Sequence, residues 1–305
     1  MTEETIRWYL PYEAPMQLAG FAWFARDRVY NRLPRNFKMP FREPVEYLAA
    51  NTAGGQIRFQ TDAPQVSVRV KLKEAHNMDH MPATGQCGFD CYVGEPGAQQ
   101  FVGTSRMDRS LDHYESIVMN APERAMRNIT LNFPLYQGVE EVYVGLAPDA
   151  QILPPPPYAD DRPVIVYGTS ITQGGCASRP GMLHTNILSR WSNRPYINLG
   201  FSGNSKGDPE VAEAIADIPN PGGYVLDYEA NAGQEGLENT LEPFIATLRT
   251  SHPKTPILVV SRPRFAGEWI NPEASKTREK ARDFQRDTVA RLTAAGDANL
   301  FFHDG

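Results

Sequence analysis

The chain has 305 residues, of which 41% are hydrophobic and 22% are charged. These are the proportions of ordinary globular proteins, so they exclude a disordered chain, a collagen and a coiled coil. The length suits two domains or one large α/β domain. The formal net charge is −6, and no run of lysine and arginine is interleaved with aromatic residues. We therefore expect no nucleic-acid partner.

The cysteines and the first residues indicate the environment of the protein. Three cysteines are an odd number and lack paired metal spacing, so we expect free thiols and neither a disulfide scaffold nor a zinc cage. The opening MTEETIRWYL lacks the basic start and apolar run of a signal peptide. No stretch reaches the roughly 18 apolar residues of a bilayer span. We expect a cytoplasmic protein that makes no membrane contact.

Short runs with strand character recur between residues 45 and 147. Turn-forming sequences separate their β-branched and aromatic residues, which is typical of an antiparallel sandwich or jelly roll. In one run Val68, Val70 and Leu72 alternate with polar residues, as in a half-buried strand. We predict an N-terminal β-sandwich domain over residues 1–150, with strands at 56–62, 66–73, 88–94, 128–134 and 139–147.

Four consecutive prolines interrupt this pattern within residues 151–163. A run of prolines cannot join the interior of a sheet, and it stiffens as polyproline II. The hydrophobic period also changes after this segment, from short strands to strands that alternate with helices. We therefore predict that residues 151–163 form an interdomain linker and that a second domain covers residues 164–305.

The second domain is predicted to be an α/β fold with a mostly parallel sheet covered on both faces. Its helices are indicated by apolar stripes, the first of which comprises Leu183, Ile187 and Trp191. Ligands of such folds bind at the carboxyl ends of the strands. The other stripes are Val211, Ile215 and Ile218, then Leu237, Leu241, Phe244 and Leu248. We expect strands at 164–168, 196–200, 223–229, 256–263 and 299–304, and helices near 181–192, 208–218, 236–250 and 273–295.

The loop after the first of these strands carries a candidate nucleophile. Ser170 follows Gly168 at the carboxyl edge of the sheet, among glycines that permit a tight turn. A turn-capping serine is the alternative. A third interpretation is an anion-binding or flavin-binding loop, although the segment lacks GxGxxG and a P-loop lysine.

Two further loops bring hydrogen-bond donors to the same edge. The loop after Gly200 contains Gly203, whose bare backbone permits close approach of its N–H to an oxyanion. The loop after the third strand contains Asn231, whose carboxamide NH2 is a neutral donor of the same kind, with an Asx turn as the alternative. Together the loops supply a nucleophile and two donors in chain order.

This order resembles the SGNH (GDSL-like) hydrolases. Residues 168–171, GTSI, resemble the GDSI block of that family, Gly203 its glycine block and Asn231 its asparagine block. The resemblance implies a flavodoxin-like three-layer domain in which Ser170 attacks an acyl carbon. It also implies an oxyanion hole made by the N–H groups of Ser170 and Gly203 and the Asn231 side chain, with no metal or cofactor.

A second motif narrows the resemblance to one subgroup. Residues 88–92, GFDCY, are similar to the GxDLY motif of an N-terminal β domain, with Cys91 in place of leucine. Asp90 and Tyr92 of this motif are interpreted as structural, because an aspartate at the start of a strand often anchors a turn. Such domain pairs commonly deacylate carbohydrates, so the implied substrate is an O-acetyl sugar ester. A non-catalytic carbohydrate-binding protein is the alternative.

The sequence departs from the family at two positions. The GxND block reads Asp227-Tyr228-Glu229-Ala230-Asn231, and the DxxH block is absent, because the fifth predicted strand ends the sequence at Gly305. We expect a truncated form of a longer enzyme in preference to a pseudoenzyme. The spacing of His76 and His80 suits two zinc ligands on a helix, but we expect a solvated loop there. None of the six histidines is expected to replace the missing base: His76, His80, His113, His184, His252 and His303.

Overall fold

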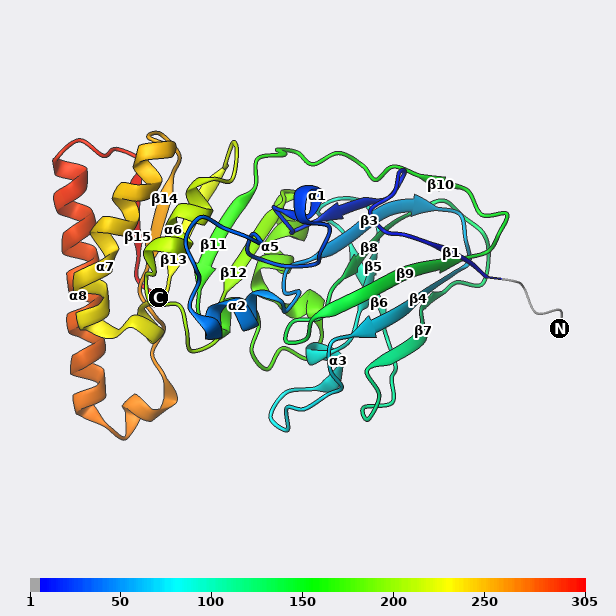
Figure 1. Cartoon of the computed structure of the whole chain (residues 1–305), viewed down its shortest axis with the longest axis horizontal. Coiled ribbons are helices and arrows are strands. Elements are labelled where there is room, and N and C mark those ends of the chain that lie inside the picture. Colours follow the sequence, from blue (N-terminus) through cyan, green and yellow to red (C-terminus); the bar gives the residue numbers. More distant parts are fainter. Residues whose placement is uncertain (1–5) are drawn as a thin grey trace.

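The computed structural model describes residues 6–305, and Figure 1 shows their arrangement. Two antiparallel sheets lie toward the end of the molecule that holds the N-terminus. A five-stranded parallel sheet follows, and the long helices α7 (Glu229–Ser251) and α8 (Pro272–Ala294) cover the opposite end. Among the helices of residues 6–305, none combines the length and the apolar character that a bilayer crossing requires.

The antiparallel sheets confirm the predicted β-sandwich. One sheet has the order β1-β9-β4-β7, and the other has the order β10-β3-β8-β5-β6 with β2 paired to β3. Strands β1, β2, β6, β7 and β10 were not expected from the sequence. The strands are β1 (Arg7–Tyr9), β2 (Gln17–Ala19), β3 (Gln56–Thr61), β4 (Gln65–Leu72), β5 (Asp90–Val93), β6 (Gln100–Thr104), β7 (His113–Asn120), β8 (Arg127–Asn132), β9 (Val139–Leu146) and β10 (Ile152–Leu153).

The alternation predicted for β4 is present in the structure. Val68, Val70 and Leu72 are buried in the core of the sandwich, whereas Arg69 between them is exposed. Side chains of successive residues point to opposite faces of a strand, so a period of two places the apolar set inside. The short helix α3 (Ala83–Gln86) precedes β5 and lies near the segment that follows the candidate nucleophile.

The five-stranded parallel sheet confirms the α/β prediction. Its order is β12-β11-β13-β14-β15, and all four pairings are parallel. This is the flavodoxin-like order, in which the second strand lies on one side of the first and the remaining strands on the other. The strands are β11 (Val164–Gly168), β12 (Tyr196–Gly200), β13 (Gly223–Asp227), β14 (Ile257–Val260) and β15 (Leu300–His303).

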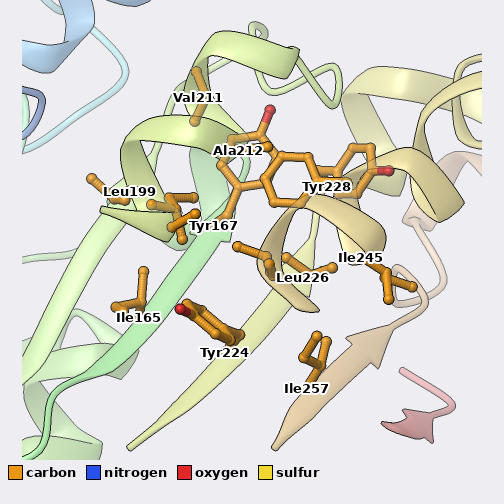
Figure 2. Packing of buried hydrophobic residues seen from close by; sticks show 14 of the residues in the cluster. Ile165, Tyr167, Leu199, Val211, Ala212, Tyr224, Leu226, Tyr228, Ile245 and Ile257 are labelled. Atoms are coloured by element: carbon orange, nitrogen blue, oxygen red, sulfur yellow. The ribbon is translucent and has the colours of Figure 1, made fainter. Parts of the chain in front are cut away.

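Helices cover both faces of this sheet. Helices α6 (Pro209–Ala216), α7 and α8 pack side by side. The crossover from β11 to β12 runs in the opposite direction to the later ones, so right-handed crossovers place α5 (His184–Ser192) on the other face. Figure 2 shows Val211 of α6 and Ile245 of α7 in one buried cluster with the strand residues Ile165, Leu226 and Ile257. The stripes predicted for α6 and α7 are buried as expected.

The stripe predicted for α5 is wrong at its last position: Leu183 is buried and Ile187 is half-buried, but Trp191 faces solvent. Trp191 is 74% exposed, and the buried residues of this helix are Thr185, Asn186 and Ser189. Their polar groups are satisfied locally: Asn186 donates to the Pro180 carbonyl, and the Thr185 hydroxyl accepts from Asn198. Because these hydrogen bonds compensate burial, a polar face can be buried and an apolar stripe misleads.

Helix α7 begins earlier than expected. The predicted strand 223–229 ends at Asp227, and Glu229 is already the first residue of α7. Gly233 has φ 66° and ψ −178°, so a single helical turn joins the main helix across a kink. Only glycine adopts this conformation readily, which is why the periodic pattern begins after the kink.

An N-terminal segment, residues 20–50, packs against the parallel sheet. It contains α1 (Phe24–Asp27) and α2 (Glu43–Ala49). Leu33, Val45 and Ala49 belong to the same buried cluster as Leu199 of β12. The core of the parallel sheet therefore includes side chains from residues 20–50, whose helix α2 lies beside β11 and β12 in Figure 1.

The proline segment is attached to both neighbouring units. Its first residues form β10, which pairs with β3 at the sheet edge. Further along, the Pro156 carbonyl accepts from Arg58, and the Pro157 carbonyl accepts from Asn193 just after α5. Tyr158 lies beneath the Arg58 guanidinium, 3.7 Å from the ring centroid. These contacts hold residues 152–158 along the surface of the molecule.

Candidate active site

Ser170 lies at a sharp turn between a strand and a helix. Strand β11 ends at Gly168, and Ser170 is the first residue of the short helix α4 (Ser170–Gln173), which Gly174 ends in a left-handed conformation. A Cβ atom on Gly168 would overlap the Thr172 hydroxyl and lie 2.8 Å from the Asp227 carbonyl oxygen. Glycine is therefore required at this strand end, and it allows the chain to turn and present Ser170.

The three predicted loops begin at one edge. Gly168 lies opposite Gly200 on β12 and opposite Asp227 on β13. Hydrogen bonds connect the loops: Phe201 N–H donates to the Gly168 carbonyl at 2.8 Å. Parallel strands in register bring their carboxyl ends together, so the nucleophile loop, the glycine loop and the asparagine loop meet here.

Asn231 is held by the loop that carries Gly203. Its Oδ1 accepts from Ser205 N–H at 3.3 Å, and the Ser205 hydroxyl donates to the Gly168 carbonyl. With Oδ1 engaged in this way, the Asn231 NH2 group remains as the donor. Gly203 has φ 71° and an exposed backbone, and no atom lies within 4 Å of a Cβ built on it. Asn231 is therefore hydrogen-bonded to the loop that carries Gly203.

The main chain of Ser170 is anchored by two neighbours. Its carbonyl accepts from the Tyr136 hydroxyl at 3.1 Å and from Gly175 N–H at 2.7 Å. Tyr136 comes from the segment between β8 and β9, so the N-terminal part of the chain contributes directly to the position of Ser170. Sequence reasoning missed Tyr136, because nothing in its neighbourhood of the sequence marks it as a contact of a residue 34 positions later.

Two carboxyl groups lie at the end of β13: half-buried Asp227 is its last residue, and buried Glu229 begins α7. Asp227 accepts from the Thr172 hydroxyl at 3.1 Å, and burial raises its pKa to about 6. Glu229 accepts from Arg262 N–H and from Gln285, and burial raises its pKa as well. Both groups lie in the segment that replaces the GxND block. They connect the candidate site to α4, to the loop after β14 and to α8.

Within residues 6–305, no histidine is hydrogen-bonded to Ser170. His184 is the first residue of α5, and burial lowers its pKa. His252 Nδ1 is hydrogen-bonded to the Tyr224 hydroxyl, and His303 is exposed on β15. His76 contacts the Met81 carbonyl. Since the chain around it is a loop, the helix face that zinc ligation would need does not form there.

The GxDLY-like motif connects the sandwich to the segment after Ser170. Asp90 is fully buried; its carboxylate accepts from Asn132 at 2.7 Å and from Gly181 N–H at 2.6 Å. Burial raises its pKa to about 6. The Tyr92 ring lies 3.9 Å from the Arg190 guanidinium of α5. Asp90 thus anchors a turn of the neighbouring unit, which agrees with the structural interpretation of the motif.

Comparison with known proteins gives matches along nearly the whole chain. Residues 161–305 match the GDSL-like Lipase/Acylhydrolase family. Residues 6–152 match the family described as the N-terminus of Esterase_SGNH_hydro-type, or GxDLY. No curated protein matches the chain.

Solved structures share this architecture. A protein from Bacteroides ovatus ATCC 8483, described as a GDSL-like lipase, is 29% identical with a TM-score of 0.88, over 98% of this chain and 87% of that one. A salicylyl-acyltransferase from a tetracycline biosynthetic pathway is 21% identical with a TM-score of 0.79, over 98% and 85%. A family two carbohydrate esterase from Clostridium thermocellum, in complex with cellohexaose, is 14% identical with a TM-score of 0.57, over 83% and 82%. The last two likenesses show the fold alone. The two family matches, on a fold with the strand order and loops described above, identify a GDSL-like lipase/acylhydrolase domain in residues 161–305 and a GxDLY-type N-terminal domain in residues 6–152.

Proposed function

We propose that the protein is a serine esterase that removes O-acyl groups, with O-acetyl groups of a carbohydrate as the favoured substrate. One observation carries the proposal: the Ser205 N–H bond to Asn231 Oδ1 joins the glycine loop to the asparagine beside the Ser170 turn. In this proposal residues 164–305 supply the chemistry, and the β-sandwich within residues 1–150 narrows the site or holds a glycan.

The proposed reaction proceeds through an acyl enzyme. Ser170 Oγ attacks the acyl carbon, a new C–O bond forms, and the hydroxyl proton passes to a base. The carbonyl oxygen becomes an oxyanion, which the N–H groups of Ser170 and Gly203 and the Asn231 NH2 stabilise. Collapse expels the sugar alkoxide, which takes up a proton. Water then hydrolyses the acyl enzyme to the free acid and Ser170.

A non-catalytic carbohydrate-binding function is the second candidate. The observation in its favour is that, in residues 6–305, no histidine contacts Ser170, so its hydroxyl is not activated by a neighbouring imidazole. A serine without a base keeps a neutral, poorly nucleophilic hydroxyl. A protein of this kind would bind an acylated sugar without releasing the acid.

The test is acetate release from an acetylated xylooligosaccharide, together with hydrolysis of 4-nitrophenyl acetate. The 305-residue chain is compared with Ser170→Ala, with and without added imidazole as an external base, and with a form extended through any downstream reading frame. Loss of one member of the catalytic set lowers kcat by about three to six orders of magnitude in serine hydrolases. We expect activity in at least one wild-type form and none above background in the alanine variant.

Two results would contradict the esterase proposal. Equal rates for wild type and Ser170→Ala would remove the serine from the mechanism. Retained binding of the oligosaccharide by calorimetry, with no acetate released by any form, would favour the binding protein. The alanine variant also corrects for direct cleavage of the nitrophenyl ester by imidazole.

A further inference from the structure

We propose that Arg42 and Arg32, both in the N-terminal segment 20–50, position the loop that presents Gly203 to the oxyanion. The inference rests on the proposed esterase function and extends it, because it makes the N-terminal segment a part of the oxyanion-binding apparatus. The loop comprises residues 201–208, between β12 and α6.

Arg42 is hydrogen-bonded to the carboxyl-terminal half of this loop. Its guanidinium donates to both carboxylate oxygens of Asp208, from Nε at 2.6 Å and from Nη2 at 2.8 Å. Nη2 also donates to the main-chain carbonyl of Asn204 at 2.5 Å. Asn204 directly follows Gly203, so this contact fixes the backbone next to the proposed donor. A planar guanidinium that engages a carboxylate through two bonds carries geometric specificity that a point charge lacks.

Arg32 holds the beginning of the same loop. It is 1% exposed, and its Nη1 donates to the Gly200 carbonyl at 2.5 Å. Its other donors go to the Asn51 and Leu48 carbonyls, and its guanidinium lies 4.9 Å from the centroid of the Phe201 ring. Burial lowers its pKa to about 9.

No carboxylate pairs with Arg32 among the described residues. A buried cation without a counter-charge is costly, so a neutral apolar residue would serve the core better if packing were its only role. Its charge is used on main-chain carbonyls, those of Leu48 and Asn51 and that of Gly200 at the carboxyl end of β12. Position 32 therefore contributes orientation of that strand end, which leads directly into Phe201 and Gly203.

The position of Gly203 depends on the hydrogen bonds that Arg42 and Arg32 make to this loop. Its φ of 71° lies in the left-handed region, and it has open space where a side chain would be. On the far side, Ser202 N–H donates to Gln173 and Ser205 N–H donates to Asn231. The loop is thus held between the catalytic domain and the N-terminal segment. Removing one side releases the Asn204 carbonyl and leaves the half-buried Asp208 without its cation.

The test compares Arg42→Gln with Lys38→Gln. Lys38 is a matched control because it also joins the N-terminal segment to the α6 region, through an ion pair with Glu213 at 3.0 Å, but that pair does not contact the loop. Small misplacements of catalytic groups cost about 100-fold in rate. In an active form of the protein, at a temperature where both variants are folded, we expect Arg42→Gln to lower kcat about 10- to 100-fold relative to Lys38→Gln, with a similar KM.

Three further measurements make the result decisive. Arg42→Lys keeps the positive charge but lacks the planar guanidinium that makes two bonds to Asp208, so it should recover only part of kcat. Ser170→Ala, measured first, shows whether the esterase proposal holds, so its failure is distinguished from that of the present inference. Hydrogen exchange of residues 201–208 should speed up in Arg42→Gln and not in Lys38→Gln. A serine-dependent activity with equal kcat in the two glutamine variants would overturn the inference, as would a loss confined to KM.

Discussion

At the scale of single residues, Asp227 couples the stability of the candidate site to pH. Its carboxylate accepts from Thr172, and burial raises its pKa to about 6 from an ordinary value of 3.8. The folded protein therefore binds more protons than the unfolded chain between about pH 4 and pH 6. Because of this excess, the contribution of Asp227 to the free energy of unfolding is largest below pH 4 and falls as the pH rises through that window.

Asp227→Asn should remove this dependence, because an amide does not titrate and its oxygen still accepts from Thr172. We expect wild type to lose about 3 kcal/mol relative to the variant between pH 4 and pH 7, at 1.36 kcal/mol for each pKa unit. Urea unfolding at a series of pH values measures the difference. Asp79→Asn, at a fully exposed position, is the control. Parallel curves for wild type and Asp227→Asn would show that the pKa is not raised.

At the scale of elements, the turn from β11 to α4 depends on one glycine. Gly168→Ala places a methyl group against the Thr172 hydroxyl and near the Asp227 carbonyl. Overpacking of this kind costs about 1 to 3 kcal/mol and shifts the backbone. We expect lower stability in urea and loss of any Ser170-dependent activity. Gly267→Ala is the matched control, since no atom lies within 4 Å of its added Cβ. Equal stability of the two variants would contradict the packing argument.

The elements also show what a single sequence can and cannot predict. The parallel strands and the stripes on α6 and α7 follow from periodicity, because these elements bury apolar faces against a sheet. The buried face of α5 does not follow from periodicity. Its buried residues are Thr185, Asn186 and Ser189, and the cost of burying them is compensated by hydrogen bonds that only the fold creates. Strand β6 was missed for a related reason: Phe101 and Val102 are exposed, so the apolar-in alternation is absent.

The candidate site likewise contains residues that the sequence predicts and residues that it does not. Ser170, Gly203 and Asn231 remain the proposed catalytic residues; each follows a predicted strand, and the register of a parallel sheet brings such positions together. Tyr136 and Arg32 were not predictable, because the contacts that join them to Ser170 and Gly200 lie 34 and 168 positions away in the sequence. Local patterns carry no information about which distant backbone carbonyl a side chain will reach.

At the scale of the whole molecule, the parallel sheet is not complete without the beginning of the chain. Trp23, Leu33, Val45 and Ala49 are buried in its core. Removing large buried side chains costs about 2 to 5 kcal/mol each, whereas a whole domain is stable by only about 5 to 15 kcal/mol. The free energy of unfolding that would be lost with this segment is thus comparable to the total stability of the domain.

Residues 161–305 produced alone should therefore show no cooperative thermal transition. Co-expression with residues 1–160 should restore one, because the missing side chains and Arg32 are supplied from the second fragment. Circular dichroism during heating measures both. A sharp transition for residues 161–305 alone would mean that the N-terminal segment is dispensable for folding of the parallel sheet, and the division of the chain at the proline segment would then be a division into independent folding units.

The buried guanidinium of Arg32 also bears on how the protein is made. Its acceptor at Gly200 is translated 168 residues later. At about 5 to 20 residues per second this is a delay of roughly 8 to 34 s on the ribosome. During that interval the segment 20–50 exposes Trp23, Leu33 and a cation without its site, although the sandwich strands after it are already complete. Trp23 and Leu33 are thus synthesised well before β12, and they reach their buried positions only after that strand has left the ribosome.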